Sequence, residues 1–84
     1  MPILSRFYGI IIRMYFQQAE HNPPHFHAQY NDEGAIIAIM DGQVLSGELP
    51  QKALEMVQEW LEKHRAELLE IWKTQNFKKI KPLE

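Results

Sequence analysis

The chain has 84 residues and a formal net charge of −2, from nine basic and eleven acidic residues. This length suits one domain and excludes two separate cores or a large enzyme fold. The sequence contains no cysteine, which excludes disulfides, thiolate catalysis and cysteine-ligated zinc. The charge gives no general attraction to nucleic acid, and no apolar run approaches the roughly 20 residues of a membrane span. Because the N-terminus also lacks a secretory signal layout, we expect a cytoplasmic protein.

Turn residues and hydrophobic periodicity divide the chain into a strand-rich part at 1–49, a helix at 50–76 and a tail at 77–84. We expect one α+β domain over residues 1–84, an antiparallel meander of about four strands with a long helix packed on one face. The helix begins at Pro50, and one of its faces is apolar, with Leu54, Val57, Leu61, Leu68 and Trp72 at helical spacing. A helix this long is unusual in so small a domain, so we also expect a bend or break near His64.

Four strands are predicted in the first half. The first covers residues 6–17, and alternation places one set of its side chains on the core face: Tyr8, Ile10, Ile12, Met14 and Phe16. The second covers residues 25–30, after a loop stiffened by two prolines, and the third covers residues 35–40. The pair Asp41-Gly42 favours a tight type I′ hairpin into a fourth strand at residues 44–49.

Three of the four histidines lie in the segment His21-Asn-Pro-Pro-His25-Phe-His27. On a strand, His25 and His27 point to the same face with Cβ atoms about 6.5–7 Å apart, which lets two imidazoles share one metal ion such as Zn or Ni. His21 is a third candidate ligand. Three nearby carboxylates are further candidates: Glu20, Asp32 and Glu33. The same histidines equally suit acid–base catalysis, or a simple polar covering of an open sheet face.

Side-chain alternation also predicts a recognition surface on the sheet face opposite the helix. If the first two strands pair with residue numbers that sum to about 42, Gln29 lies opposite Arg13. The predicted surface comprises Arg13, Tyr15, His25, His27 and Gln29, with Phe7 and Ile11 beside them. A face that mixes aromatic, arginine and histidine groups is typical of a protein interface, and its rings also allow single-stranded RNA to stack. A solvated face without a ligand is the plain alternative.

The second half contains fewer candidates for chemistry. His64 falls on the apolar face of the helix, where we expect a core histidine bonded to backbone or to a tyrosine. Trp60 and Trp72 are predicted to belong to the core. Three lysines follow in the tail: Lys78, Lys79 and Lys81. They fit a solvated end, with phosphate binding as the alternative, and the tail itself fits either a frayed end or a last short strand.

Four segments spread over the chain carry a family resemblance. They are Ser5-Arg-Phe-Tyr-Gly-Ile-Ile-Ile-Arg-Met-Tyr15, His21-Asn-Pro-Pro-His-Phe-His-Ala28, Gly47-Glu-Leu-Pro50 and the helix segment from Trp60 through His64-Arg to Glu67-Leu-Leu. Together they resemble the small bacterial DUF4160 family, a domain of unknown function. The resemblance implies that the histidine segment is the family's signature. The residue before its first histidine is usually Asp in the family, whereas this chain has Glu20.

The resemblance also implies a partner, because members are commonly encoded beside another short uncharacterised protein. That layout is similar to a toxin–antitoxin gene pair, which is an association and not a mechanism. We therefore predict an interaction module that binds a small protein through Arg13, Tyr15, His25 and His27. The alternatives are a small metal-dependent hydrolase or nuclease that uses His21, His25 and His27, and an RNA-binding module. An unpaired sheet edge also allows a homodimer.

Overall fold

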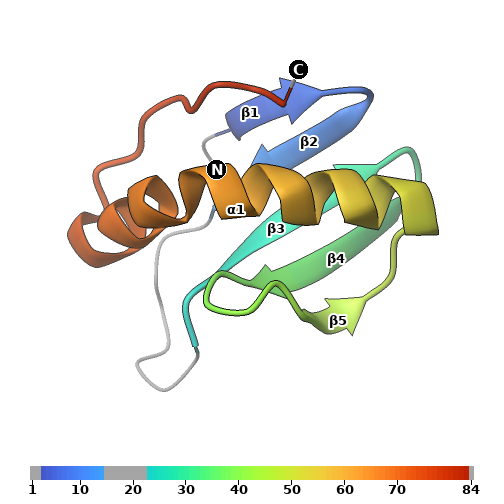
Figure 1. The fold of residues 1–84 in the computed structure, drawn as a ribbon, viewed down its shortest axis with the longest axis horizontal. Helices are drawn as coiled ribbons and strands as arrows, with labels where there is room; N and C mark the ends of the chain where they lie inside the picture. Colours follow the sequence, from blue (N-terminus) through green and yellow to red (C-terminus); the bar gives the residue numbers. More distant parts are fainter. Residues whose placement is uncertain (1–2, 15–22, 84) are drawn as a thin grey trace.

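A computed structural model describes residues 3–14 and 23–83 of the chain. Five strands form one antiparallel sheet in the order β1-β2-β3-β4-β5, and a long helix lies across one face of it (Figure 1). The elements are β1 (Ile3–Phe7), β2 (Ile10–Arg13), β3 (His25–Tyr30), β4 (Glu33–Ala38), β5 (Val44–Gly47) and α1 (Gln51–Thr74). The expected α+β fold is confirmed, with one strand more than the approximate four.

The extra strand arises because the predicted single strand at residues 6–17 reverses direction at Tyr8–Gly9. Both turn residues have positive φ, 51° at Tyr8 and 82° at Gly9. They form a two-residue hairpin loop, since Phe7 pairs directly with the first residue of β2. This is the geometry of a type I′ turn, which matches the twist of antiparallel strands. The reversal moves Phe7 from the predicted open face into the core and leaves Tyr8 60% exposed.

β3 starts at His25 as predicted, but it pairs with β2 two residues away from the predicted register. Arg13 lies opposite His27, where the prediction placed Gln29, so paired residue numbers sum to 40 and not to 42. A shift of two residues keeps every side chain on its predicted face, because side chains alternate with a period of two. Phe26 is accordingly fully buried, while the histidines on either side of it are only partly buried.

The loop between β4 and β5 is longer than the predicted hairpin at Asp41-Gly42. Gly42 has a positive φ of 75°, but Asp41 does not, so the type I′ turn is not formed. Instead, Oδ1 of Asp41 accepts a hydrogen bond from the N–H of Gln43, and the Gly42 carbonyl accepts one from the side-chain amide of Gln58. The first bond shapes the loop itself, and the second ties the loop to α1. β5 follows as a short edge strand whose four residues are all exposed.

α1 follows Pro50 as predicted, and its regular geometry is interrupted at His64, where φ is −126° and ψ is 18°. The expected break near this residue is therefore confirmed. One side of the helix is buried against the sheet: Ala53, Val57, Trp60, Leu61, Leu68, Ile71 and Trp72. Both tryptophans belong to the core, as predicted. No helix in the described part of the chain is long and apolar enough to cross a membrane.

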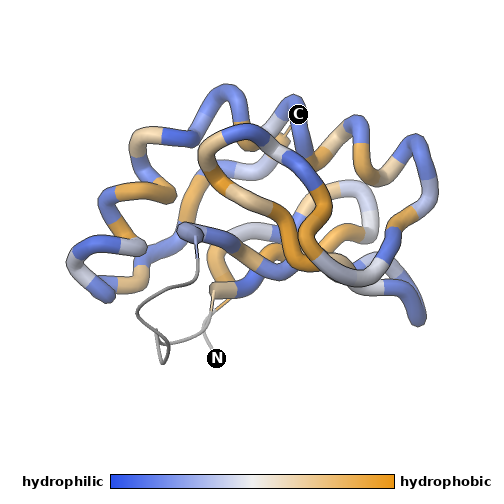
Figure 2. Tube along the Cα trace, turned by 90° about the horizontal axis from the view of Figure 1, so that it is seen from below, coloured by the Kyte–Doolittle hydropathy of each residue, from blue (hydrophilic) through white to orange (hydrophobic). Residues whose placement is uncertain are grey.

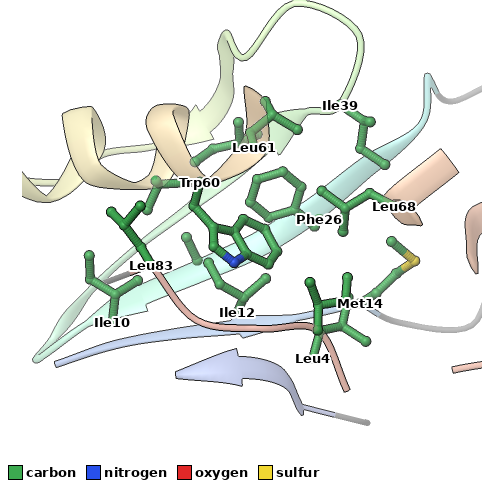
Figure 3. Packing of buried hydrophobic residues seen from close by; sticks show 14 of the residues in the cluster. Leu4, Ile10, Ile12, Met14, Phe26, Ile39, Trp60, Leu61, Leu68 and Leu83 are labelled. Carbon is green, nitrogen blue, oxygen red and sulfur yellow. The ribbon is translucent and has the colours of Figure 1, made fainter. Parts of the chain in front are cut away.

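The hydrophobic core lies between α1 and the sheet, with the indole of Trp60 at its centre (Figure 3). The ring of Phe26 meets this indole edge-on at 5.8 Å, and the ring of Phe7 lies 5.6 Å away. Hydrophobic and hydrophilic residues alternate along the chain, as expected for elements that each present one side to a core (Figure 2). Burying a large apolar side chain of this kind contributes about 1.5–3 kcal/mol.

The tail returns along the molecule to the edge of the sheet formed by β1 (Figure 1). The N–H of Ile80 donates to the carbonyl of Leu4 at 2.7 Å, and the indole N–H of Trp60 donates to the carbonyl of Lys81 at 2.8 Å. Ile80 and Leu83 are buried. The tail is thus neither frayed nor a regular strand, and it partly covers the β1 edge. At the opposite edge of the sheet, all four residues of β5 are exposed.

Candidate functional site

The face of the sheet that α1 leaves open carries the predicted recognition residues. Arg13 reaches it from β2, and His25, His27 and Gln29 reach it from β3. The structure therefore brings together four of the five residues of the predicted surface. The fifth residue, Tyr15, lies outside the described residues. Phe7 is the exception among the neighbours named from the sequence, since it lies in the core.

A groove of about 390 Å³ crosses this open face. Its hollow shape follows from the sequence, because Gly34, Ser46 and Gly47 line it where larger residues would fill the space. Ile11 and Ile36 supply apolar side chains to the same lining. A residue with a Cβ fits at Gly34, because the nearest neighbour of that Cβ would be the backbone oxygen of Ala28 at 3.6 Å, an ordinary contact distance.

Opposite charges mark the two ends of the groove. Arg13 and His27 lie side by side at one end, as directly paired residues of β2 and β3. Asp32 and Glu33 line the other end, where β3 turns into β4. Three strand residues separate His27 from that turn, which is roughly 10 Å at the rise of a β-strand. The guanidinium of Arg13 is oriented by a hydrogen bond from Nη1 to Oε1 of Gln29 at 2.8 Å.

The two histidines of the open face differ in their surroundings. Burial lowers the pKa of His27, and the neighbouring positive charge of protonated His25 lowers it further. His25 lies nearer the end of the helix, with its ring 5.0 Å from that of Trp72. Its Nδ1 lies 2.9 Å from the carbonyl oxygen of Pro23. A carbonyl oxygen only accepts, so this bond places the proton of neutral His25 on Nδ1 and leaves Nε2 as an acceptor.

The rings of His25 and His27 lie 5.7 Å apart, centre to centre. A metal about 2.1 Å from one nitrogen of each ring would hold the two centres roughly 5–6 Å apart. Within the described part of the chain, however, no group of three or more histidine, aspartate or glutamate residues is placed to hold a metal ion. Asp32 and Glu33 therefore do not complete the predicted ligand set. The two other ligands named from the sequence, His21 and Glu20, lie outside the described residues.

His64 was expected to bond to backbone or to a tyrosine, and the structure corrects this expectation. Its Nδ1 lies 2.7 Å from Oε1 of Glu67, one turn further along α1. The sequence did contain the signal, because residues three apart lie on the same side of a helix and an imidazole pairs readily with a carboxylate.

A family model described as a domain of unknown function, DUF4160, matches residues 9–73, which is more than half of the chain. The chain belongs to this family. The DUF4160 match runs from the β1–β2 turn into the last turn of α1, so it includes the groove and the histidines His25 and His27. No curated protein and no solved structure matches the chain.

Proposed function

We propose that this DUF4160 protein is an interaction module that binds a small protein partner in the groove of the open sheet face. The observation that carries this proposal is the groove of about 390 Å³, with apolar residues in its lining and opposite charges at its ends. Segments of partner proteins dock in grooves of this kind, where pockets for individual side chains give specificity. The first candidate partner is a protein encoded by a neighbouring gene, as in a toxin–antitoxin pair.

The charges of the groove define the segment that fits it. The guanidinium of Arg13 has five N–H donors, and its fork matches the two oxygens of a carboxylate. Asp32 and Glu33 attract a lysine or arginine at the other end. Ile11, which pairs with Gln29, suits an apolar side chain between the two charges, and Ile36 adds apolar surface beside His27. The expected partner segment therefore carries an acidic, an apolar and a basic residue in succession over roughly 10 Å, about three residues of extended chain.

Filling the groove tests this proposal without removing any charged residue. In Gly34→Ile, the new side chain occupies the hollow on the open face. We expect the variant to fold, because a Cβ at this position meets only ordinary contacts. The partner is captured from the native host with tagged wild-type protein and identified. Its dissociation constant is then measured for the wild type, for Gly34→Ile and for a control, Glu70→Ile, which adds the same side chain to the exposed side of α1.

The proposal predicts that Gly34→Ile weakens partner binding at least about 30-fold, or about 2 kcal/mol, while Glu70→Ile binds like the wild type. His27→Ala should weaken binding as well while leaving the fold intact, because it removes the imidazole that lies beside Arg13 at that end of the groove. Equal binding by Gly34→Ile and the wild type would contradict the proposal. So would the absence of any partner that depends on the groove.

A metal site is the second candidate function, and the geometry of His25 and His27 favours it. Their ring separation suits a shared metal ion. The bond from Nδ1 of His25 to the Pro23 carbonyl is the kind of outer contact that orients the other nitrogen of a metal-binding histidine. A metal held there by these two histidines supplies a Lewis acid or an activated water, the chemistry of a hydrolase or nuclease.

Calorimetric titration with Zn²⁺ and Ni²⁺ distinguishes the two functions. The metal hypothesis predicts one ion per chain in the wild type and none in the double variant His25→Ala/His27→Ala. It also predicts unchanged metal binding in Gly34→Ile, whose added side chain leaves both imidazoles in place. Metal binding that survives the double variant, or no binding by the wild type, rejects the metal site and leaves the partner proposal standing.

A further inference from the structure

A second hollow lies at the break of α1, away from the open sheet face. It measures about 490 Å³ and is lined by Lys63, His64, Lys81 and Pro82. Two elements distant in sequence meet there, because the indole N–H of Trp60 holds the Lys81 carbonyl at 2.8 Å. The hollow is therefore built by the fold, from α1 on one side and the tail on the other.

The imidazole of His64 is fixed at this hollow from two sides. Its ring packs 5.4 Å from that of the fully buried Trp60, and its Nδ1 lies 2.7 Å from Oε1 of Glu67. A carboxylate accepts, so the bond fixes the proton of neutral His64 on Nδ1. The non-helical φ and ψ of His64 set this geometry, because they break the regular path of the helix at this one residue.

The other ring nitrogen of His64, Nε2, is available to a ligand. It forms no hydrogen bond with a described residue. The buried side-chain atoms without a partner do not include it, so it is not fully buried. An unpartnered atom that is not buried is accessible to solvent. Only 15% of the His64 side chain is exposed, so this accessible part lies where the residue lines the hollow.

We propose that this hollow binds a phosphate group, as inorganic phosphate or as a phosphate ester, between His64, Lys63 and Lys81. When Nε2 takes a proton from solvent or from the bound monoanion, the imidazolium donates to a phosphate oxygen from Nε2 and to Glu67 from Nδ1. The two ammonium groups add positive charge at the rim, where lysine acts as a point charge for phosphate. A phosphate offers several acceptor oxygens, so it suits donors supplied from both sides of the hollow, by α1 and by the tail.

Among the described residues, the carboxylates of Glu67 and Glu59 contact side chains that line this hollow, and both contacts are compatible with an anion. Glu67 holds the imidazole through Nδ1 and leaves Nε2 facing the hollow. Glu59 lies 3.8 Å from the Lys63 ammonium, with both side chains more than half exposed. An exposed ion pair of this kind is worth little, so the Lys63 side chain turns towards a bound phosphate at small cost.

Titration with inorganic phosphate tests the proposal, with NMR detection of the His64 imidazole and the Trp60 indole N–H at constant pH and ionic strength. We expect both signals to shift together and to saturate, with a dissociation constant on the order of 1 mM. Lys63→Gln and Lys81→Gln should each weaken binding at least about fivefold, because each removes one charge at the rim. Lys81→Gln keeps the backbone carbonyl that Trp60 needs. The control is Lys73→Gln, an exposed lysine of the same helix that does not line the hollow, and it should bind like the wild type.

A titration with chloride at the same ionic strength distinguishes a specific phosphate site from general ionic screening. The proposal predicts no saturable shift with chloride, and a lost response to phosphate in His64→Gln, whose fold is checked by circular dichroism. Equal responses to chloride and phosphate would overturn it. So would equal phosphate affinity in Lys63→Gln, Lys81→Gln and Lys73→Gln, because the lysines of the rim would then behave like any surface lysine.

Discussion

The two faces of the sheet are built from the same strands, but the helix α1 covers only one of them. On the face under α1, the side chains are sealed: Ile10, Ile12, Phe26 and Ile37 are each 0% exposed. On the open face, the same strands alternate to partly buried or exposed residues, among them Ile11, Arg13 and His27. Because one helix covers only one face, the chemistry-bearing residues gather on the other.

This difference separates the roles of neighbouring residues. A residue on the covered face contributes to folding, and in the proposed function the residue next to it on the open face contributes to recognition. Side chains alternate strictly between the two faces. Substitutions at adjacent positions of β3 should therefore differ: one should mainly lower stability, and the other should mainly weaken partner binding. Substitutions on each face test this separation, and their expected effects on stability range from a loss of several kcal/mol to a small gain.

Truncating Phe26 should have the largest effect on stability. Phe26→Ala removes a ring that is fully buried against Trp60, and such substitutions cost about 3–5 kcal/mol. A domain of this size is stable by roughly 0.05–0.15 kcal/mol per residue, or about 4–13 kcal/mol in total, so the variant should lose a large share of its stability. Urea unfolding followed by circular dichroism measures the change. In the adjacent variant His27→Ala, we expect a loss of less than about 1 kcal/mol; a comparable loss in both would contradict the separation of the faces.

The two glycines of the groove should respond differently to the same substitution. Gly47 has a φ of 77°, and a Cβ there would collide with the backbone carbonyl oxygen of Gly34. Gly47→Ala should therefore destabilise the protein by about 1–3 kcal/mol. At Gly34 a Cβ meets only ordinary contacts, so Gly34→Ala should be neutral or should stabilise by about 0.4–1 kcal/mol. Thermal unfolding of the two variants compares them, and equal midpoints would be the contrary result.

The lowered pKa of His27 makes part of the stability depend on pH. The folded protein holds a proton at His27 less tightly than the unfolded chain does, because of burial and then of His25. The contribution of His27 to the unfolding free energy is fully present at a pH above its ordinary pKa of 6.5. It is lost as the pH falls through 6.5 towards the lowered pKa of the folded state. Between about pH 7.5 and pH 5.5, the wild type should thus lose more unfolding free energy than His27→Gln. Parallel losses in the two proteins would show that His27 is not the group responsible.

The smallest expected change is a gain at Ser5. Its hydroxyl oxygen is buried and has no hydrogen-bond partner among the described residues. Removing an unsatisfied buried polar group relieves its desolvation cost, so Ser5→Ala should stabilise the protein by about 0.5 kcal/mol. Chemical denaturation measured to that precision is the test. A loss of about 1 kcal/mol or more, by the same scale, would mean that the hydroxyl makes a bond that the geometry does not show.

The open face was predictable from the sequence because face depends only on the parity of the strand position. The predicted and observed registers of β2 and β3 differ by two residues, so His27 and not Gln29 lies directly opposite Arg13, while Gln29 still accepts a hydrogen bond from Arg13. This difference moves no side chain to the other face. The register itself depends on the path of the loop between the strands, which the sequence pattern does not determine.

The turn at Tyr8–Gly9 was not predicted because only one of its two central residues is typical of such a turn. A type I′ turn needs positive φ at both central positions, and an aromatic residue rarely adopts it. Tyr8 does so in this protein, with only Gly9 to mark the reversal inside an apolar run that reads as one continuous strand. The charge polarity of the groove was likewise not predicted, because it depends on how the β3–β4 turn and β5 lie beside the pair of Arg13 and His27.

The most direct test of the central claim maps the partner's footprint on the protein. Isotope-labelled protein is titrated with the captured partner, and the backbone amide shifts are followed by NMR. We predict that the largest shifts fall at Ile11, Arg13, His27, Gln29 and Ile36, with little change along the exposed side of α1. A footprint centred on α1, with the open face unchanged, would contradict the assignment of recognition to this face.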